Sequence, residues 1–239
     1  MRSTEVIFPY NESVETRFKQ AKHLFHASMN GIVAEKLSNL GYKLNFGVSL
    51  NRIYEIASQF DADNLLAKRC WWFPCRETMI LATLLLEKDL SKCPLTEEDL
   101  QLWTSRLFNL ELCEQFSKNF LSKVVPAETA NGRIDGEFFS VFLLKNRNSE
   151  YEIALGYITI ANLLLRGVSL NEIDFILSQI KNDATSANYN VYSTVARCLR
   201  AFARRMPDVA KNVIEELKDK DGRGLPFIME EVKTELEYC

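Results

Sequence analysis

The sequence predicts an all-α protein built from successive pairs of helices. Apolar side chains recur at intervals of three and four residues through nearly every segment of the 239-residue chain, which is the period of an amphipathic helix. Residues that favour helix N-termini precede many of these segments, and no alternating strand pattern separates them. The 9 glycines and 6 prolines are too few for an all-β protein rich in tight turns.

In the first half of the chain, the apolar stripes predict helices over residues 12–27, 29–39, 50–60, 62–72, 75–88 and from 96 to about 107. The stripe of the first helix comprises Val14, Phe18, Ala21 and Phe25. Ser28, Ser49 and Asp61 are the expected N-caps of the three helices that follow. Thr96 and Asp99 have the spacing of a capping box, in which each side chain bonds the backbone of the other residue.

In the second half, helices are expected over residues 110–124, 135–145, 150–166, 170–182, 189–205 and 208–220, with a last short helix after a turn at 222–226. A polar break at 126–132 separates the first two. Ser149 with Glu152 and Ser169 with Glu172 form two further expected capping boxes.

Degenerate helix pairs joined by short loops, without a strict sequence repeat, are typical of an α-solenoid of HEAT-like or armadillo-type repeats. A globular helical bundle is the alternative. The solenoid is favoured because a single bundle core would have to enclose too many helices. We therefore expect one repeat domain over residues 1–239, with an acidic C-terminal extension over residues 214–239.

The composition is that of a soluble protein, with 47% hydrophobic and 26% charged residues. No apolar run approaches the roughly 18 residues that span a membrane, and the N-terminal residues lack the apolar core of a signal peptide. We expect a cytoplasmic monomer without a membrane partner.

Neither a metal site nor a cofactor is expected. The cysteines have irregular spacing and predict buried thiols in a reducing compartment; they are Cys70, Cys75, Cys93, Cys113, Cys198 and Cys239. His23 and His26 lie three residues apart, but no third ligand has a suitable spacing.

The charge is unevenly distributed along the chain. The net charge is −3, and residues 214–239 hold eight acidic and four basic residues, so the rest of the chain carries +1. Arg197, Arg200 and Arg204 would share one face of a helix. This stripe is either a phosphate-binding surface or simply the solvated face of an amphipathic helix.

Three segments resemble the DNA alkylation repair family, the AlkD-like HEAT-repeat proteins. YKLNFGVSLNRIYEIA at 42–57 resembles a family signature in which a Gly-Val turn precedes a helix with a basic residue. The matching residues are Gly47, Val48, Ser49 and Arg52. RETMILA at 76–82 and VARCLRAFARR at 195–205 resemble two further helices in the same order. The resemblance covers about residues 15–215.

The resemblance implies a glycosylase that removes positively charged alkylated purines. In the family a carboxylate stabilises cationic character at the sugar, and aromatic faces assist it. The family motif Asn-Trp-Asp-x-x-Asp falls on residues 109–114, which places Glu114 at the catalytic aspartate and Glu111 at the other acidic position. The tryptophan of this motif falls on Leu110, and a second catalytic tryptophan, which the family carries on a late helix, falls on Arg197. Neither aromatic side chain is therefore present.

The resemblance therefore leaves two interpretations that involve nucleic acid. One is a glycosylase with Glu114 as the carboxylate. The other is a relative with altered or lost activity that binds DNA, damaged or structured, through a concave basic face. That face would comprise Arg197, Arg200, Arg204, Lys43, Arg52 and Arg106. The alternative function is a non-catalytic scaffold that holds a peptide or protein in its groove.

Several aromatic residues have two interpretations. Trp71 and Trp72 could stack on bases, although packing at a helix end is favoured, and Trp103 lies on an apolar stripe. Tyr189 and Tyr192 precede the arginine stripe and could line the same groove.

Overall fold

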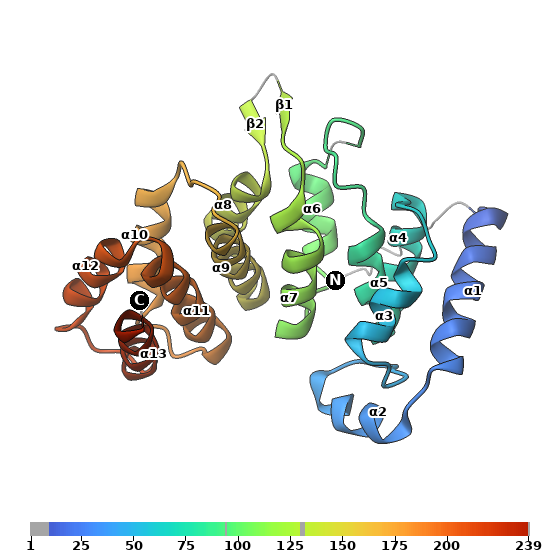
Figure 1. Cartoon of the computed structure of the whole chain (residues 1–239), viewed down its shortest axis with the longest axis horizontal. Coiled ribbons are helices and arrows are strands. Elements are labelled where there is room, and N and C mark those ends of the chain that lie inside the picture. The colour runs from blue at the N-terminus through green and yellow to red at the C-terminus, as the bar shows by residue number, and fades with distance from the viewer. Residues whose placement is uncertain (1–9, 94, 130–131, 239) are drawn as a thin grey trace. The chain divides into compact units, whose positions relative to one another are not determined.

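The computed structural model describes residues 10–93, 95–129 and 132–238, and consists almost entirely of α-helices (Figure 1). The all-α prediction is confirmed. The chain forms two compact units that divide between Glu87 and Lys88. The single domain expected over residues 1–239 stays a prediction.

The first unit contains five helices in its described residues and one 3₁₀ turn. They are α1 (Glu12–Ala27), α2 (Gly31–Leu37), η1 (Ser38–Leu40), α3 (Leu50–Ala57), α4 (Asn64–Trp71) and α5 (Arg76–Leu85). The stripe expected for α1 is buried, as predicted. Ser49 caps α3 by accepting a hydrogen bond from the N–H of Arg52.

Two expected caps in this unit are wrong. Ser28 instead closes α1, where its N–H bonds the carbonyl of Phe25 at 3.0 Å, and Asn30 caps α2. Asp63 rather than Asp61 caps α4, because its carboxylate reaches the first free N–H groups of that helix at 2.8 and 2.9 Å.

A buried carboxylate organises the Gly-Val turn of this unit. Glu77 is fully buried and accepts hydrogen bonds from the N–H groups of Phe46, at 3.0 Å, and Val48, at 3.2 Å. Between them Gly47 has a φ of +68°, and a Cβ there would lie 2.2 Å from the carbonyl oxygen of Asn30. Only glycine fits this turn.

The second unit contains eight helices in its described residues, one 3₁₀ turn and one hairpin. Its helices are α6 (Glu97–Thr104), α7 (Leu110–Asn119), α8 (Gly136–Asn146), α9 (Glu150–Leu165), α10 (Ile173–Asp183), α11 (Tyr189–Arg205), α12 (Pro207–Leu217) and α13 (Leu225–Glu237), with η2 (Leu121–Lys123) after α7.

The hairpin was not expected from the sequence. Strand β1 (Ala127–Thr129) pairs antiparallel with β2 (Gly132–Ile134), with Glu128 opposite Arg133. Strands of three residues are too short to show an alternating pattern. Residues 130–131 of the expected polar break lie outside the described residues.

Helices α7, α9 and α11 lie next to one another in the second unit. The first residues of α9 and α11 meet where Glu150 accepts a hydrogen bond from Asn190 at 2.7 Å. Their ends meet where Arg205 donates to the carbonyl of Leu165 at 2.7 Å. The two helices therefore run parallel. Ser117 of α7 contacts α9 through Asn162, at 2.8 Å.

The three expected capping boxes have different outcomes. Thr96 and Asp99 form a complete box at α6. Ser149 caps α9, but Glu152 bonds the N–H of Asn148 at 3.2 Å and the hydroxyl of Thr104 at 2.8 Å instead of returning to Ser149. The box expected from Ser169 and Glu172 is wrong, since α10 begins at Ile173 without a side-chain cap of its own.

The N-terminus of α10 is held by a carboxylate from another helix. Glu137 of α8 is 4% exposed. Its Oε1 accepts from the N–H groups of Asn171, at 2.6 Å, and Glu172, at 2.7 Å. A charged acceptor at this position satisfies free N–H groups and interacts favourably with the helix dipole. Glu137 therefore replaces the expected cap.

The expected burial of the thiols is confirmed for four cysteines, whereas Cys93 is half-buried. Cys70, Cys75, Cys113 and Cys198 are buried, and burial together with the nearby carboxylate of Glu77 raises the pKa of Cys75 to about 12. Cys239 lies outside the described residues. In the part of the chain that the structure describes, no helix combines the length and apolar character needed to cross a membrane.

Replacing Glu137 by alanine should destabilise the second unit by roughly 2–4 kcal/mol, because two N–H groups would be left without a charged acceptor. Urea unfolding followed by circular dichroism measures the change. Glu172→Ala is the matched control, since its exposed side chain does not cap α10, and it should change stability by less than about 0.5 kcal/mol. Equal effects of the two variants would contradict this role for Glu137.

Candidate nucleic-acid interface

The three arginines of the expected stripe lie along α11 and border one open depression of about 380 Å³. Leu165 of α9, Ser193 of α11, and Phe227 and Glu231 of α13 also line it. The guanidinium groups are accessible, because the side chains of Arg197, Arg200 and Arg204 are 39%, 41% and 46% exposed. We call this feature the arginine depression.

Each of these arginines is paired with a carboxylate. Arg197 Nη1 lies 2.8 Å from Glu114 Oε1. Arg200 binds Glu231 through Nη1 at 2.8 Å and Glu235 through Nε at 3.0 Å. Arg204 also binds Glu235, through Nε and, at 3.0 Å, through Nη2. The acidic C-terminal segment thus packs onto the arginine stripe through α13.

Glu235 is the best buried of these carboxylates, with its side chain 10% exposed. The hydrogen bond from Arg204, followed by that from Arg200, holds the pKa of Glu235 below its usual range, although burial opposes this. The ionised form is the one that joins α13 to α11.

Two further arginines lie at the same end of α9 and α11. Arg166 is exposed and directly follows Leu165, which lines the depression. Arg205 is exposed and bonds the Leu165 carbonyl. In the described part of the chain neither has a carboxylate within ion-pair distance. Arg205 lines a neighbouring depression together with Leu164 and Ser169, and not the arginine depression itself. Cations at helix C-termini are also stabilised by the helix dipole.

Two residues that align with catalytic positions of the resembled family are in contact in the structure. Glu114, at the position of the catalytic carboxylate, is bound directly by Arg197, at the position of the second tryptophan. Both lie on exposed surface. Arg197 also lies 3.5 Å from the side-chain oxygen of Asn162. Glu111 lies in the first turn of the same helix and is half-buried.

Arg106, the other predicted cation of the second unit, is not among the residues that line the arginine depression. Arg106 follows α6 and is half-buried, and burial lowers its pKa. Lys43 and Arg52 belong to the first unit. Lys43 is exposed, and Arg52 binds Glu55 at 2.8 Å on its own helix.

The tryptophans pack in the interior. Trp71 is fully buried, and Trp103 is 5% exposed with its ring stacked on Phe116 at 6.0 Å between centroids. Trp72 is half-buried at the C-cap of α4. Packing at a helix end, the favoured interpretation of Trp71, is confirmed.

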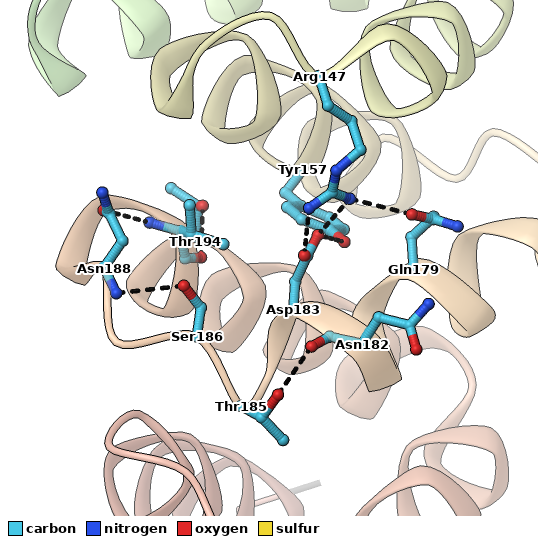
Figure 2. Close-up of polar contacts among 10 residues, drawn as sticks. Arg147, Tyr157, Gln179, Asn182, Asp183, Thr185, Ser186, Asn188 and Thr194 are labelled. Atoms are coloured by element: carbon cyan, nitrogen blue, oxygen red, sulfur yellow. Dashed lines mark hydrogen bonds and ion pairs between the residues drawn. The ribbon is translucent and has the colours of Figure 1, made fainter.

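A second polar cluster joins α8, α9 and α10 (Figure 2). Arg147 ends α8 with a left-handed φ of 53°, and its guanidinium binds Asp183 at 2.5 and 3.0 Å and Gln179 at 3.0 Å. The buried Tyr157 hydroxyl donates to Asp183 at 2.6 Å, and burial raises the pKa of Tyr157. These groups satisfy one another, so the cluster is a structural link.

No group of three or more His, Cys, Asp and Glu side chains that could hold a metal ion occurs within residues 10–93, 95–129 and 132–238. His23 and His26 are both exposed on α1.

Comparison with known proteins identifies a structural relative but no sequence match. No protein-family model and no curated protein matches the chain. Among solved structures, the chain is similar to a member of "a new family of proteins related to the HEAT-like repeat DNA glycosylases with affinity for branched DNA structures". The TM-score is 0.73 at 16% identity, over 92% of this chain and 94% of that chain.

The fold is that of these HEAT-like repeat proteins. The resemblance inferred from the three short segments is thus confirmed at the level of the fold. At 16% identity, the comparison does not transfer an activity.

Sequence reasoning missed the residues that surround the arginine stripe. Glu231 and Glu235 are four residues apart on the expected last helix, so their shared face could have been recognised as complementary to the stripe. Phe227 and Asn162 carried no such signal, because their contacts depend on how α13 and α9 pack against α11.

Replacing Glu235 by glutamine should reduce the pH dependence of stability. Because the folded-state pKa of Glu235 is lowered, its stabilising contribution is present above the pKa of the unfolded chain and is lost as the pH falls through the folded-state value. The wild type should therefore lose more stability than Glu235→Gln on acidification, as measured by urea midpoints over a pH series. Glu230→Gln, an exposed site on the same helix, should follow the wild type; parallel curves for all three proteins would contradict the assignment.

Proposed function

We propose that this chain is a DNA-binding HEAT-like repeat protein that contacts DNA through the arginine depression and does not excise bases. The observation that carries the proposal is the stripe of three accessible arginines, Arg197, Arg200 and Arg204, that borders the depression. Arg166 and Arg205, at the nearby ends of α9 and α11, add two exposed cations that have no carboxylate within ion-pair distance in the described residues. Guanidinium groups suit phosphate because they offer several N–H donors in a planar array.

The affinity of the structural relative's family for branched DNA supports the same kind of ligand. A guanidinium has five N–H donors, so a carboxylate contact does not exhaust it. Phosphate can therefore bind beside or in place of Glu231 without leaving the arginine unpaired.

The absence of base excision follows from the surroundings of Glu114. Arg197 neutralises this carboxylate at 2.8 Å, so its charge is less available to stabilise a cationic sugar. Arg197 itself would repel such a cation, and Leu110 provides no aromatic face. We therefore assign Glu114 to the ion pair with α11.

A protein-binding scaffold is the second candidate. It is favoured by the pairing of every stripe arginine with a carboxylate and by the net charge of −3. A depression that is bordered by arginines and carboxylates also suits a peptide that carries both positive and negative charges.

The DNA-binding proposal predicts salt-sensitive binding that depends on these arginines. Fluorescence anisotropy with a labelled four-way junction and a labelled duplex, at about 50 and about 200 mM salt, would compare the wild type with Arg197→Ala/Arg200→Ala and Arg166→Ala/Arg205→Ala. Each double substitution should weaken binding and reduce the salt slope by about one for every phosphate that the variant no longer binds.

The matched control is Lys211→Ala/Lys218→Ala, which removes two exposed cations from the α12 region. It should bind like the wild type. Absence of binding at low salt would reject the DNA proposal and leave the scaffold. Release of methylated purine that is abolished by Glu114→Gln would show that the chain is a glycosylase after all.

A further inference from the structure

Three aromatic rings continue the arginine depression toward the start of α11. Tyr189 is 59% exposed, and its ring centroid lies 5.4 Å from that of Tyr192. The Tyr192 centroid lies 5.8 Å from that of Phe227, which lines the depression. We call Tyr189, Tyr192 and Phe227 the aromatic strip.

Tyr189 of the strip shares one face of α11 with Arg200 and Arg204. With 3.6 residues per turn, Tyr189, Ser193, Arg200 and Arg204 project from the same side of the helix. At about 1.5 Å per residue, Arg197 lies about 12 Å along the axis from Tyr189, and Arg204 about 10 Å further. Tyr189 thus lies at one end of this face and the guanidinium groups at the other.

The strip is held by rigid elements. Gly224, just before α13, packs so tightly on Tyr192 that an added Cβ would lie 2.4 Å from the Tyr192 Cβ. This contact fixes Tyr192 between α11 and the first turn of α13. Tyr189 and Phe227, on either side of it, keep exposed ring surface (59% and 37% of each residue). A preformed stacking surface loses little conformational freedom on binding.

The chemistry of this face favours unpaired bases. Exposed aromatic rings stack on any nucleobase, and basic side chains beside them bind the connecting phosphates. In a duplex the bases are already stacked, so exposed rings on the protein would gain little and only phosphate contacts would remain. Because Glu114, Glu231 and Glu235 offset much of the arginine charge, stacking has to supply a larger share of the affinity.

We propose that the aromatic strip and the arginine depression form one binding site for single-stranded nucleic acid. Bases stack on Tyr189 and Phe227, and the phosphates that follow bind Arg197, Arg200 and Arg204. This inference rests on the proposed DNA-binding function and specifies its ligand.

The test compares a labelled single-stranded oligothymidylate with a labelled duplex of the same length, by fluorescence anisotropy at one salt concentration. The wild type should bind the single strand more tightly. Tyr189→Ala and Phe227→Ala should each weaken single-strand binding at least about fivefold and leave duplex binding unchanged. Tyr189→Phe, which keeps the ring, should bind like the wild type.

Tyr238→Ala is the matched control, because Tyr238 is 85% exposed at the opposite end of α13 from Phe227; it should have no effect. Duplex binding that equals or exceeds single-strand binding, with no change in Tyr189→Ala, would overturn this inference and leave the DNA-binding function intact. Failure of the wild type to bind single-stranded, duplex or branched DNA would reject both.

Discussion

Buried glutamates bind backbone N–H groups of the loops between helices in both units. Glu77 binds the turn around Gly47, Glu137 binds the start of α10, and Glu152 binds the loop before α9. Short loops leave the first N–H groups of the following helix without partners, and a buried carboxylate satisfies them. In the second unit, Glu137 joins α8 to the start of α10, and Glu152 joins α9 to the loop before it and to Thr104 of α6. Helices α9 and α11 are joined near their two ends by the hydrogen bonds from Asn190 to Glu150 and from Arg205 to the carbonyl of Leu165.

The surface around the arginine depression carries both positive and negative side chains. The arginines of α11 are attractive partners for phosphate, yet α13 presents Glu231 and Glu235 to two of them. These carboxylates hold α13 on the core and at the same time moderate the positive field. Such a surface favours ligands that make apolar or stacking contacts as well as ionic contacts. The aromatic strip supplies those contacts, which links the ion pairs of α13 with a preference for unpaired bases.

The sequence predicted most of the fold because the apolar period and the caps are local signals. The stripe of α1, the cap at Ser49 and the box at Thr96 follow from a few neighbouring residues. The start of α10 could not be predicted in this way, because its cap comes from Glu137, more than thirty residues earlier. The arginine stripe was likewise visible from its spacing. The spacing of Glu231 and Glu235 marked a complementary acidic face, but that α13 would pack on α11 depends on tertiary contacts that the local pattern does not show.

The most direct test of the account is to observe the arginine side chains during DNA binding. Nuclear magnetic resonance resolves Nε–H groups, and those of Arg200 and Arg204 both donate to Glu235. Addition of single-stranded DNA should shift the Nε–H signals of these two residues and leave that of Arg69, which binds Glu15 in the first unit, unchanged. Unchanged signals from Arg200 and Arg204 under conditions in which DNA is bound would contradict the assignment of the arginine depression as the DNA-binding surface.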